Sequence, residues 1–206
     1  MRTIDYQPMI WLSWRKKKMR VSLNYNGRTR QPSLSDLMPL TDNSDPLYIT
    51  RGNPDLKQMF MHTMHVSFQH PSKGISANLG WQMEKNSVTQ VVLYDVQTGG
   101  REIYPINING NWNTYGSADW WKRFGHFSLK LSTSGRHSNR VSMINEDRSQ
   151  QPEKSTTRDT GLNCEMAASY QPTWGGFDFS TSWDYQYSLN SLNDNNTYTR
   201  YYNFRF

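Results

Sequence analysis

The chain is poor in several features that common protein classes need. It has a single cysteine, Cys164, so neither an internal disulfide framework nor a cysteine-based zinc site can form. Its longest unbroken apolar runs have four residues, as at residues 9–12, whereas a membrane helix requires roughly 18–20. Apolar residues are 35% of the chain and the mean hydropathy is −0.86, a balance that by itself favours disorder.

Motifs for catalysis and metal binding are also scarce. The sequence has no GxSxG, no phosphate-binding glycine loop and no HExxH. His62 and His65 would point to opposite faces of a strand, and His70 falls in a predicted turn. The acidic segment 42–45 lacks the ligand spacing of a defined calcium loop. We therefore expect no enzyme activity, no cofactor and no metal site.

Charge and targeting signals narrow the classes further. The net charge is +6 and the pI is near 9.4, but the excess is spread along the chain, so we expect no nucleic-acid partner. No basic segment followed by an apolar segment opens the sequence. We accordingly expect that a signal peptide has been removed or that the natural N-terminus lies upstream.

What the chain does have is aromatic side chains in a period-two pattern. Trp, Tyr and Phe make up 14% of the residues, which indicates an ordered fold. Apolar and polar residues alternate in segments typical of half-buried strands. Nine strands are predicted, at residues 9–14, 19–25, 60–68, 75–83, 104–112, 127–131, 162–170, 177–187 and 202–206. The predicted fold class is all-β and antiparallel.

The predicted connections differ in length on the two sides of the sheet. Short turns are expected at 15–18, 70–73, 122–125 and 171–175. Longer connections are expected at 31–56, 97–100, 134–158 and 189–196. Outer-membrane barrels have short periplasmic turns and longer extracellular loops. The pattern therefore favours a transmembrane β-barrel in contact with outer-membrane lipid, in the outer membrane of a Gram-negative bacterium.

Two sets of side chains are predicted to meet the membrane. Tryptophans near the short turns are expected to form an interfacial girdle, namely Trp14, Trp120, Trp121 and Trp174. The apolar positions of the strands are expected to face lipid: Val21, Leu23, Val66, Phe68, Leu79, Trp81, Ile106, Ile108, Leu129, Leu131, Met166, Phe179 and Trp183.

Other interpretations of the pattern stay open. A soluble β-sandwich that displays aromatic residues to a carbohydrate would also alternate, as would a passive structural barrel or adhesin. Nine is an odd number, while bacterial barrels of this kind have an even number of strands. We therefore expect residues 1–206 to form one partial barrel domain without a plug.

The segment 28–57 carries a resemblance to a known family. Its motifs are Arg30-Gln31-Pro32-Ser33, the segment Asp42 to Leu47 (DNSDPL), and the segment Gly52 to Lys57 (GNPDLK). These resemble motifs of outer-membrane β-barrel proteins of Bacteroidetes-type bacteria related to TonB-dependent receptors, although Gln58 and Met59 depart from the Pro-Glu that usually follows GNPDLK.

This resemblance implies a fold and partners beyond what the residues themselves indicate. It implies a barrel of roughly 22 strands, an N-terminal plug domain, a TonB-type energy-coupling protein, and a nutrient ligand or surface lipoprotein as partner. The ligand-binding residues are not identified by it. Since ligand contacts favour long loops, segments 31–56 and 134–158 are where we expect them.

Overall fold

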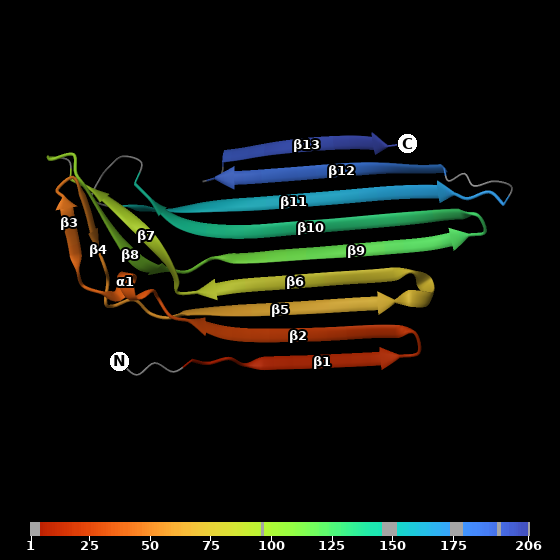
Figure 1. Cartoon of the computed structure of the whole chain (residues 1–206), viewed down its shortest axis with the longest axis horizontal. Helices are drawn as coiled ribbons and strands as arrows, with labels where there is room; N and C mark the ends of the chain where they lie inside the picture. Colours follow the sequence, from red (N-terminus) through yellow and green to blue (C-terminus); the bar gives the residue numbers. More distant parts are fainter. Residues whose placement is uncertain (1–4, 96, 146–151, 174–178, 193–194, 206) are drawn as a thin grey trace.

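The chain forms one large antiparallel sheet and one small sheet at its end. The computed structural model describes residues 5–95, 97–145, 152–173, 179–192 and 195–205. We call the large sheet the wall. Its nine strands pair in the order β1-β2-β5-β6-β9-β10-β11-β12-β13, and every pairing is antiparallel (Figure 1). The predicted all-β class and the number of strands in this sheet are confirmed.

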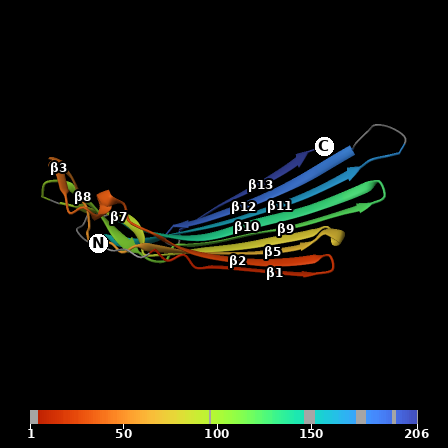
Figure 2. The same ribbon diagram turned by 60° about the horizontal axis from the view of Figure 1, so that its bottom comes forward.

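The wall strands are long. Their bounds are β1 Met9–Lys16, β2 Met19–Arg30, β5 Met59–His70, β6 Ile75–Lys85, β9 Trp112–Phe124, β10 Phe127–Ile144, β11 Glu153–Tyr170, β12 Phe179–Leu192 and β13 Asn195–Arg205. At about 3.3 Å per residue, the 18 residues of β10 span about 60 Å. The strands lie in one layer, so the alternative of a two-sheet sandwich is wrong (Figures 1 and 2).

Two excursions of the chain build the small sheet, which we call the end sheet. The segment between β2 and β5 contains α1 (Leu34–Leu37), β3 (Thr41–Asp45) and β4 (Tyr48–Arg51). The segment between β6 and β9 contains β7 (Ser87–Tyr94) and β8 (Arg101–Ile108). The strand order is β3-β4-β8-β7, and the β4–β8 pairing that joins the two excursions is parallel. Both excursions leave the wall at the same end (Figure 1).

The opposite end of the wall carries the tight connections, and we call it the turn end. The turns after β1, β5 and β9 all lie there, as the sequence predicts for segments 15–18, 70–73 and 122–125 (Figure 1). Between β5 and β6 the turn includes the 3-10 helix η1 (Pro71–Lys73). The expected turn at 171–175 lies only partly within the described residues.

The predicted strand at 104–112 is wrong, because it is two strands in different sheets. One strand ends in the end sheet and the next begins in the wall. Residues up to Ile108 belong to β8, and β9 begins at Trp112. Between them Gly110 has φ 120°, a conformation that L residues other than glycine rarely adopt. The side-chain oxygen of Asn111 accepts the N–H of Val141 at 2.7 Å, which holds the corner against β10.

Two predicted loops are also shorter than expected. Most of segment 134–158 belongs to β10 and β11, which pair without interruption from Phe127–Tyr170 to Ile144–Glu153. Segment 31–56 is not an unstructured loop, since it holds α1, β3 and β4. Its strands fit between the prolines: β3 lies between Pro39 and Pro46, and β4 lies between Pro46 and Pro54. Proline lacks a backbone N–H, so it interrupts a ladder without preventing short strands.

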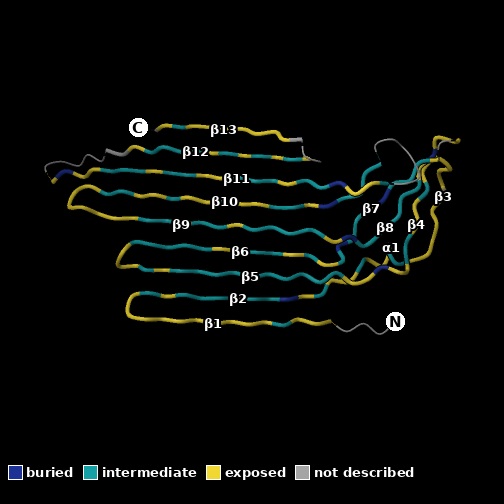
Figure 3. The backbone as a smooth tube through the Cα atoms, turned by 180° about the vertical axis from the view of Figure 1, so that it is seen from behind, coloured by how far each residue is buried: buried dark blue, intermediate teal, exposed yellow. Residues whose placement is uncertain are grey.

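The buried apolar side chains gather where the end sheet meets the wall. Among the described residues they are Leu56, Val91, Ile108 and Val141, each at most 7% exposed. Pro105 is also fully buried. The wall strands are intermediate or exposed along most of their length (Figure 3). The hydrophobic core is therefore shared by the end sheet, the segment before β5 and the adjoining end of β10, and the rest of the described wall has no buried apolar side chain.

Candidate functional site

The pairing register divides the wall into two chemically different faces. Directly paired residues share a face, because side chains alternate along each strand. One line of pairs runs across seven strands from β5 to β13 as His70, Ile75, Trp120, Leu131, Met166, Trp183 and Phe204. A parallel line on the same side contains Leu12, Leu23, Val66, Leu79, Gly116, Gly135, Leu162 and Tyr187. We call this side the apolar face.

The opposite side, the polar face, carries hydroxyl and amide groups in the same continuous register. One line of pairs crosses all nine strands as Ser13, Ser22, Ser67, Asn78, Ser117, Ser134, Asn163, Gln186 and Tyr201. Neighbouring hydroxyls bond across strands, as Ser22 does with Ser67 at 2.6 Å between the two Oγ atoms. Lys130 forms an ion pair with Glu165 at 3.3 Å. This face is built for water or polar partners.

Most of the residues predicted to face lipid lie together on the apolar face. They are Val21, Leu23, Val66, Phe68, Leu79, Trp81, Leu129, Leu131, Met166 and Trp183. Phe179 takes a register position of the same face, opposite Tyr170. Many of these side chains are open to the surroundings, with Leu79 50% and Met166 44% exposed. The wall thus presents a large uncovered apolar surface.

Ile106 and Ile108 are the exceptions, and their predicted place in the wall is wrong. Both belong to β8 of the end sheet, where Ile106 pairs with Thr89 and Ile108 with Ser87. Ile108 is only 7% exposed and belongs to the core. Alternation along 104–112 continues through the corner at Gly110, so a period-two pattern does not reveal that the strand changes sheet.

The predicted tryptophan girdle is only partly assembled. Trp14 and Trp120 lie on the apolar face, opposite Val21 and Ile75. Trp121 lies on the polar face opposite Lys130, so its assignment to the same girdle is wrong. Adjacent residues of a strand point to opposite faces, and Trp120 and Trp121 therefore cannot share one. Trp174 lies outside the described residues.

Aromatic side chains outside the predicted girdle lie at the two ends of the apolar face. At the turn end Phe124 pairs with Phe127, which in turn pairs with Tyr170. Toward the end sheet the ring of Trp112 meets His137 edge-on at 5.1 Å. Beyond His137 the same side of β10 continues with Asn139, and its partner on β11 is Arg158. The apolar face therefore has an aromatic border at the turn end, and toward the end sheet Trp112 marks the change to polar residues.

Arg200 is a cation on the apolar face that contacts two aromatic rings. Arg200 of β13 pairs with Tyr187, and its guanidinium lies 6.0 Å from the Tyr187 ring centre and 5.7 Å from that of Tyr198. Such contacts stabilise a cation by about 0.5–1 kcal/mol at exposed sites. The two rings offset part of the cost of a charge on this face.

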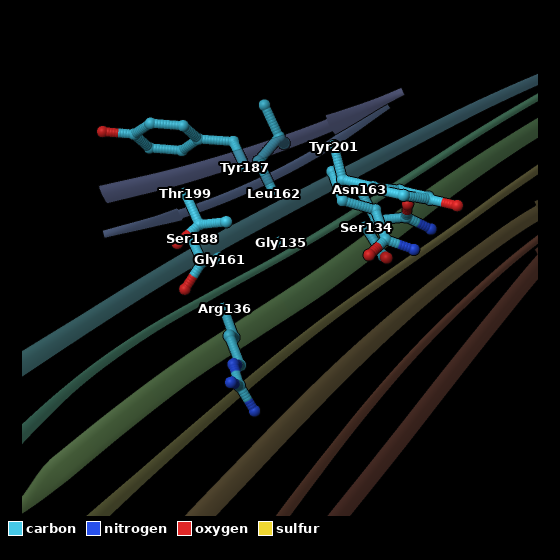
Figure 4. A pocket seen from close by; sticks show the side chains of 11 residues that line it. Ser134, Gly135, Arg136, Gly161, Leu162, Asn163, Tyr187, Ser188, Thr199 and Tyr201 are labelled. Carbon is cyan, nitrogen blue, oxygen red and sulfur yellow. The ribbon is translucent and has the colours of Figure 1, made fainter. Parts of the chain in front are cut away.

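The polar face of the wall has a hollow near its β13 edge. It has a volume of about 410 Å³ and lies across β10, β11, β12 and β13. The side chains that project into it from the polar face come from Ser134, Arg136, Asn163, Gln186, Ser188, Thr199 and Tyr201. Figure 4 shows Arg136 on one side of the strands, and Leu162 and Tyr187 on the other.

Glycine at position 161 shapes the floor of this hollow. Gly161 pairs with Arg136 on one side and with Ser188 on the other, so a gap without a side chain lies between them. The stem of Arg136 covers the gap, since a Cβ at position 161 would lie 3.4 Å from the Arg136 Cγ and Nε atoms. Residues 134–136 fall in a segment where ligand contacts were expected, but they belong to a strand.

The GNPDLK segment ties the end sheet to the start of β5. The Asn53 N–H donates to the Asp36 carbonyl at 2.6 Å, and its side-chain amide donates to the Pro105 carbonyl at 3.0 Å. Lys57 exchanges two hydrogen bonds with the Asn107 side chain, at 2.7 and 2.9 Å. A Cβ at Gly52 would lie 2.0 Å from the Met38 carbonyl oxygen, so only glycine fits there. These contacts give the motif a structural role.

The end sheet displays ionised and aromatic side chains. The Arg51 guanidinium forms an ion pair with Glu102 and lies 4.8 Å from the Tyr104 ring centre. In the turns, a hydrogen bond from the Ser44 side chain lowers the pKa of Asp42. A hydrogen bond from the Thr98 side chain likewise lowers the pKa of Asp95. Both carboxylates serve local turn geometry.

Other chemistry is sparse in the described part of the chain. No group of three His, Cys, Asp or Glu residues there could hold a metal ion. Cys164 is a free thiol on the apolar face, paired with Thr133 and Tyr185. No helix within the described ranges is long and apolar enough to cross a membrane.

Comparison with known proteins supplies one family. No curated protein and no solved structure matches the chain significantly. A family model described as an outer membrane protein beta-barrel family matches residues 4–206, which is nearly the whole chain. Together with the two-faced antiparallel wall, this match places the protein in the outer membrane. The chain belongs to the outer membrane protein beta-barrel family.

Proposed function

We propose that the chain is part of the barrel wall of an outer-membrane receptor that imports a nutrient by TonB-dependent transport. The observation that carries the proposal is the register, which keeps apolar side chains on one face and hydroxyl and amide groups on the other across nine strands. A barrel in lipid needs an apolar outside, whereas a wide lumen is wet. The apolar face is the lipid side and the polar face lines the lumen.

The orientation in the membrane follows from the two ends of the wall. The turn end is periplasmic, because periplasmic turns of such barrels are short. Its first hairpin carries Lys16, Lys17 and Lys18, which stay hydrated there. The end sheet lies on the extracellular side, where the longer connections of these barrels are found. Trp14 and Trp120 then belong to the periplasmic aromatic girdle, and Trp112 to the extracellular one.

Further strands complete the barrel. In the described structure β1 and β13 each pair on one side only. Unpaired backbone groups within hydrocarbon cost several kcal/mol each, so an open edge does not persist in a membrane. Following the resemblance, we assign the wall to a barrel of roughly 22 strands. The other strands and a plug domain would come from protein outside residues 1–206.

Energy coupling is supported by the resemblance to TonB-related barrels in the segment 28–57. Its GNPDLK part binds the end sheet to β5, which would hold an extracellular excursion firmly above the lumen. The resemblance adds a TonB-type protein and a surface lipoprotein as partners. A passive structural barrel or adhesin would share the wall but would lack the coupling partner.

The lipid side can be tested with the natural thiol. A spin label on Cys164, in protein reconstituted into vesicles, should be relaxed by oxygen, which concentrates in lipid, and protected from a water-soluble nickel complex. The matched control moves the label one residue, to the polar face, as Asn163→Cys combined with Cys164→Ser. That label should respond in the opposite way. Equal access of the nickel complex at both positions would contradict the proposal.

The proposed coupling to a TonB-type protein is tested by a separate experiment. The complete coding sequence should contain an N-terminal plug and a coupling segment. Protein purified from outer membranes should then retain the periplasmic domain of the TonB protein from the same organism on a column. Deletion of the coupling segment is the control and should abolish retention. Absence of both plug and retention would favour the passive barrel while leaving the lipid-facing wall intact.

A further inference from the structure

We infer that the hollow around Arg136 is a binding subsite for a small hydroxylated molecule that carries an oxyanion group, such as a carboxylate or a phosphate. The inference rests on the proposed function to the extent that the polar face must line the lumen. It adds a chemical class of ligand and the residue that selects it. The hollow has about 410 Å³, within the usual range for small-molecule sites and enough for a monosaccharide-sized ligand.

The charge of the lining favours an anion. Arg136 is the single ionised side chain among the residues that line the hollow, and no carboxylate is among them. Within the described residues no ion pair or hydrogen bond engages the Arg136 side chain, whereas Lys130 is already paired with Glu165. A guanidinium offers donors in a planar fork that matches carboxylate and phosphate oxygens.

The geometry holds this guanidinium in place. The Arg136 stem packs over Gly161, where no side chain competes for the space. Its backbone is fixed by pairing with Tyr115 on β9 and with Gly161 on β11. A cation whose stem is packed loses less conformational freedom when it binds a ligand.

The rest of the lining suits hydroxyl groups. Asn163 and Gln186 are directly paired and present two amides, each with donor and acceptor atoms. Ser188 and Thr199 form the next pair and present two hydroxyls. Tyr201 pairs with Gln186 and adds an exposed ring and hydroxyl. Alternating donors and acceptors beside an aromatic ring match a sugar ring with its hydroxyls.

The height of the hollow in the wall suits an entry site. Arg136 is nine residues beyond Phe127, the first residue of β10 at the turn end. Nine residues span about 30 Å along a strand. With a tilt of about 40°, this is about 23 Å above the turn end, close to the outer limit of an apolar band about 25 Å tall. The hollow therefore lies near the extracellular boundary of the membrane in the proposed orientation.

Calorimetry on the full-length protein, purified from outer membranes in detergent, tests the inference. The probes are glucuronate, glucose 6-phosphate and glucose, which share a ring and differ in charge. We expect at least one of the two anionic probes to bind ten-fold or more tightly than glucose. Arg136→Gln should remove that preference, and Arg136→Lys should retain part of it. Arg28→Gln, a polar-face cation on β2 away from the hollow, should leave the preference unchanged.

The outcomes distinguish a carboxylate ligand from a phosphate ligand. They also distinguish failure of this inference from failure of the proposed function. Preference for glucuronate alone assigns a carboxylate, and preference for glucose 6-phosphate alone assigns a phosphate. Equal binding of all three probes, no binding of any, or a preference that survives Arg136→Gln would overturn the inference. If a carboxylate from another segment of the protein already occupied Arg136, none of the three probes would bind. The spin-label contrast between residues 163 and 164 does not depend on any of them.

Discussion

The wall and the end sheet use the same kinds of apolar residues in opposite ways. In the end sheet Val91 is 1% and Ile108 7% exposed, so their side chains pack against protein. In the wall Leu131 is 39% and Met166 44% exposed, although both lie in the middle of a continuous sheet. The end sheet shares a core with the strand end beside it. In the proposed barrel the wall depends on the lipid around it, because burial of its apolar surface must come from the surroundings.

This difference means that the same substitution chemistry has different consequences in the two regions. In the proposed barrel, a charge placed on the apolar face meets hydrocarbon, while a charge on the polar face meets water. A truncation in the end sheet leaves a cavity between protein atoms. Turn interactions at the edge of the end sheet affect only a few residues.

Leu131→Lys should destabilise the folded protein in vesicles by about 2–4 kcal/mol, the cost of a cation near the bilayer midplane. Denaturant unfolding followed by tryptophan fluorescence measures it. Ser132→Lys, one residue away on the polar face, is the control and should cost less than about 1 kcal/mol. Equal losses for both variants would mean that the two faces do not meet different environments.

Val91→Ala should destabilise the end sheet locally by about 1.5–3 kcal/mol, because a fully buried valine loses most of its packing. Hydrogen exchange should accelerate in peptides from β7 and β8 and stay unchanged in β2 and β10. Val88→Ala, on the same strand, is the control with a partly exposed side chain. Faster exchange throughout the wall would show that the two regions unfold as one unit.

Arg51→Ala should cost at most about 1 kcal/mol, because its ion pair with Glu102 is solvent-exposed and its contact with the Tyr104 ring is weak. The effect should appear as faster exchange in β4 only. Arg51→Lys tests the contribution of the planar group. A loss as large as that of Val91→Ala would indicate that the parallel β4–β8 junction depends on this side chain.

The smallest effect concerns the turn after β7. The pKa of Asp95 is lowered in the folded protein, first by the Thr98 hydroxyl and then by the Gln97 N–H. This stabilisation is fully present above the ordinary pKa of the carboxyl group, and is lost as the pH falls through the lowered value. An NMR titration should detect it at the Gln97 amide. Thr98→Val should move the midpoint upward, and an unchanged midpoint would contradict the assignment.

Much of the wall was accessible from the sequence because alternation is a local property. The segments 60–68 and 75–83 lie inside β5 and β6, and their predicted faces agree with the register. The tight turns at 15–18 and 122–125 were predicted from their position between alternating segments. Apolar and polar residues alternate both in a strand that faces lipid and in a half-buried strand in water. The evidence for the outer-membrane location is therefore the family match and not the alternation alone.

The end sheet was hidden because its determinants are distant in sequence. The β4–β8 pairing joins residues about fifty positions apart, and nothing local to either strand specifies it. Trp121 was placed with Trp120 from proximity alone, although neighbouring residues of a strand face opposite ways. The hollow at Arg136 cannot be predicted from the sequence for a related reason: its lining comes from four strands, and each contributes common polar residues such as serine, asparagine or threonine.

The sequence is sufficient to predict that this chain forms antiparallel strands with one apolar and one polar face. Successive side chains of a strand point to opposite faces, so the face of each residue follows from its position along the strand. Tertiary structure decided which strands leave the wall to build the end sheet, and which polar side chains converge around one arginine. Those outcomes depend on pairings between segments that are distant in sequence. The free energy of such a pairing depends on both segments, so neither segment predicts it alone.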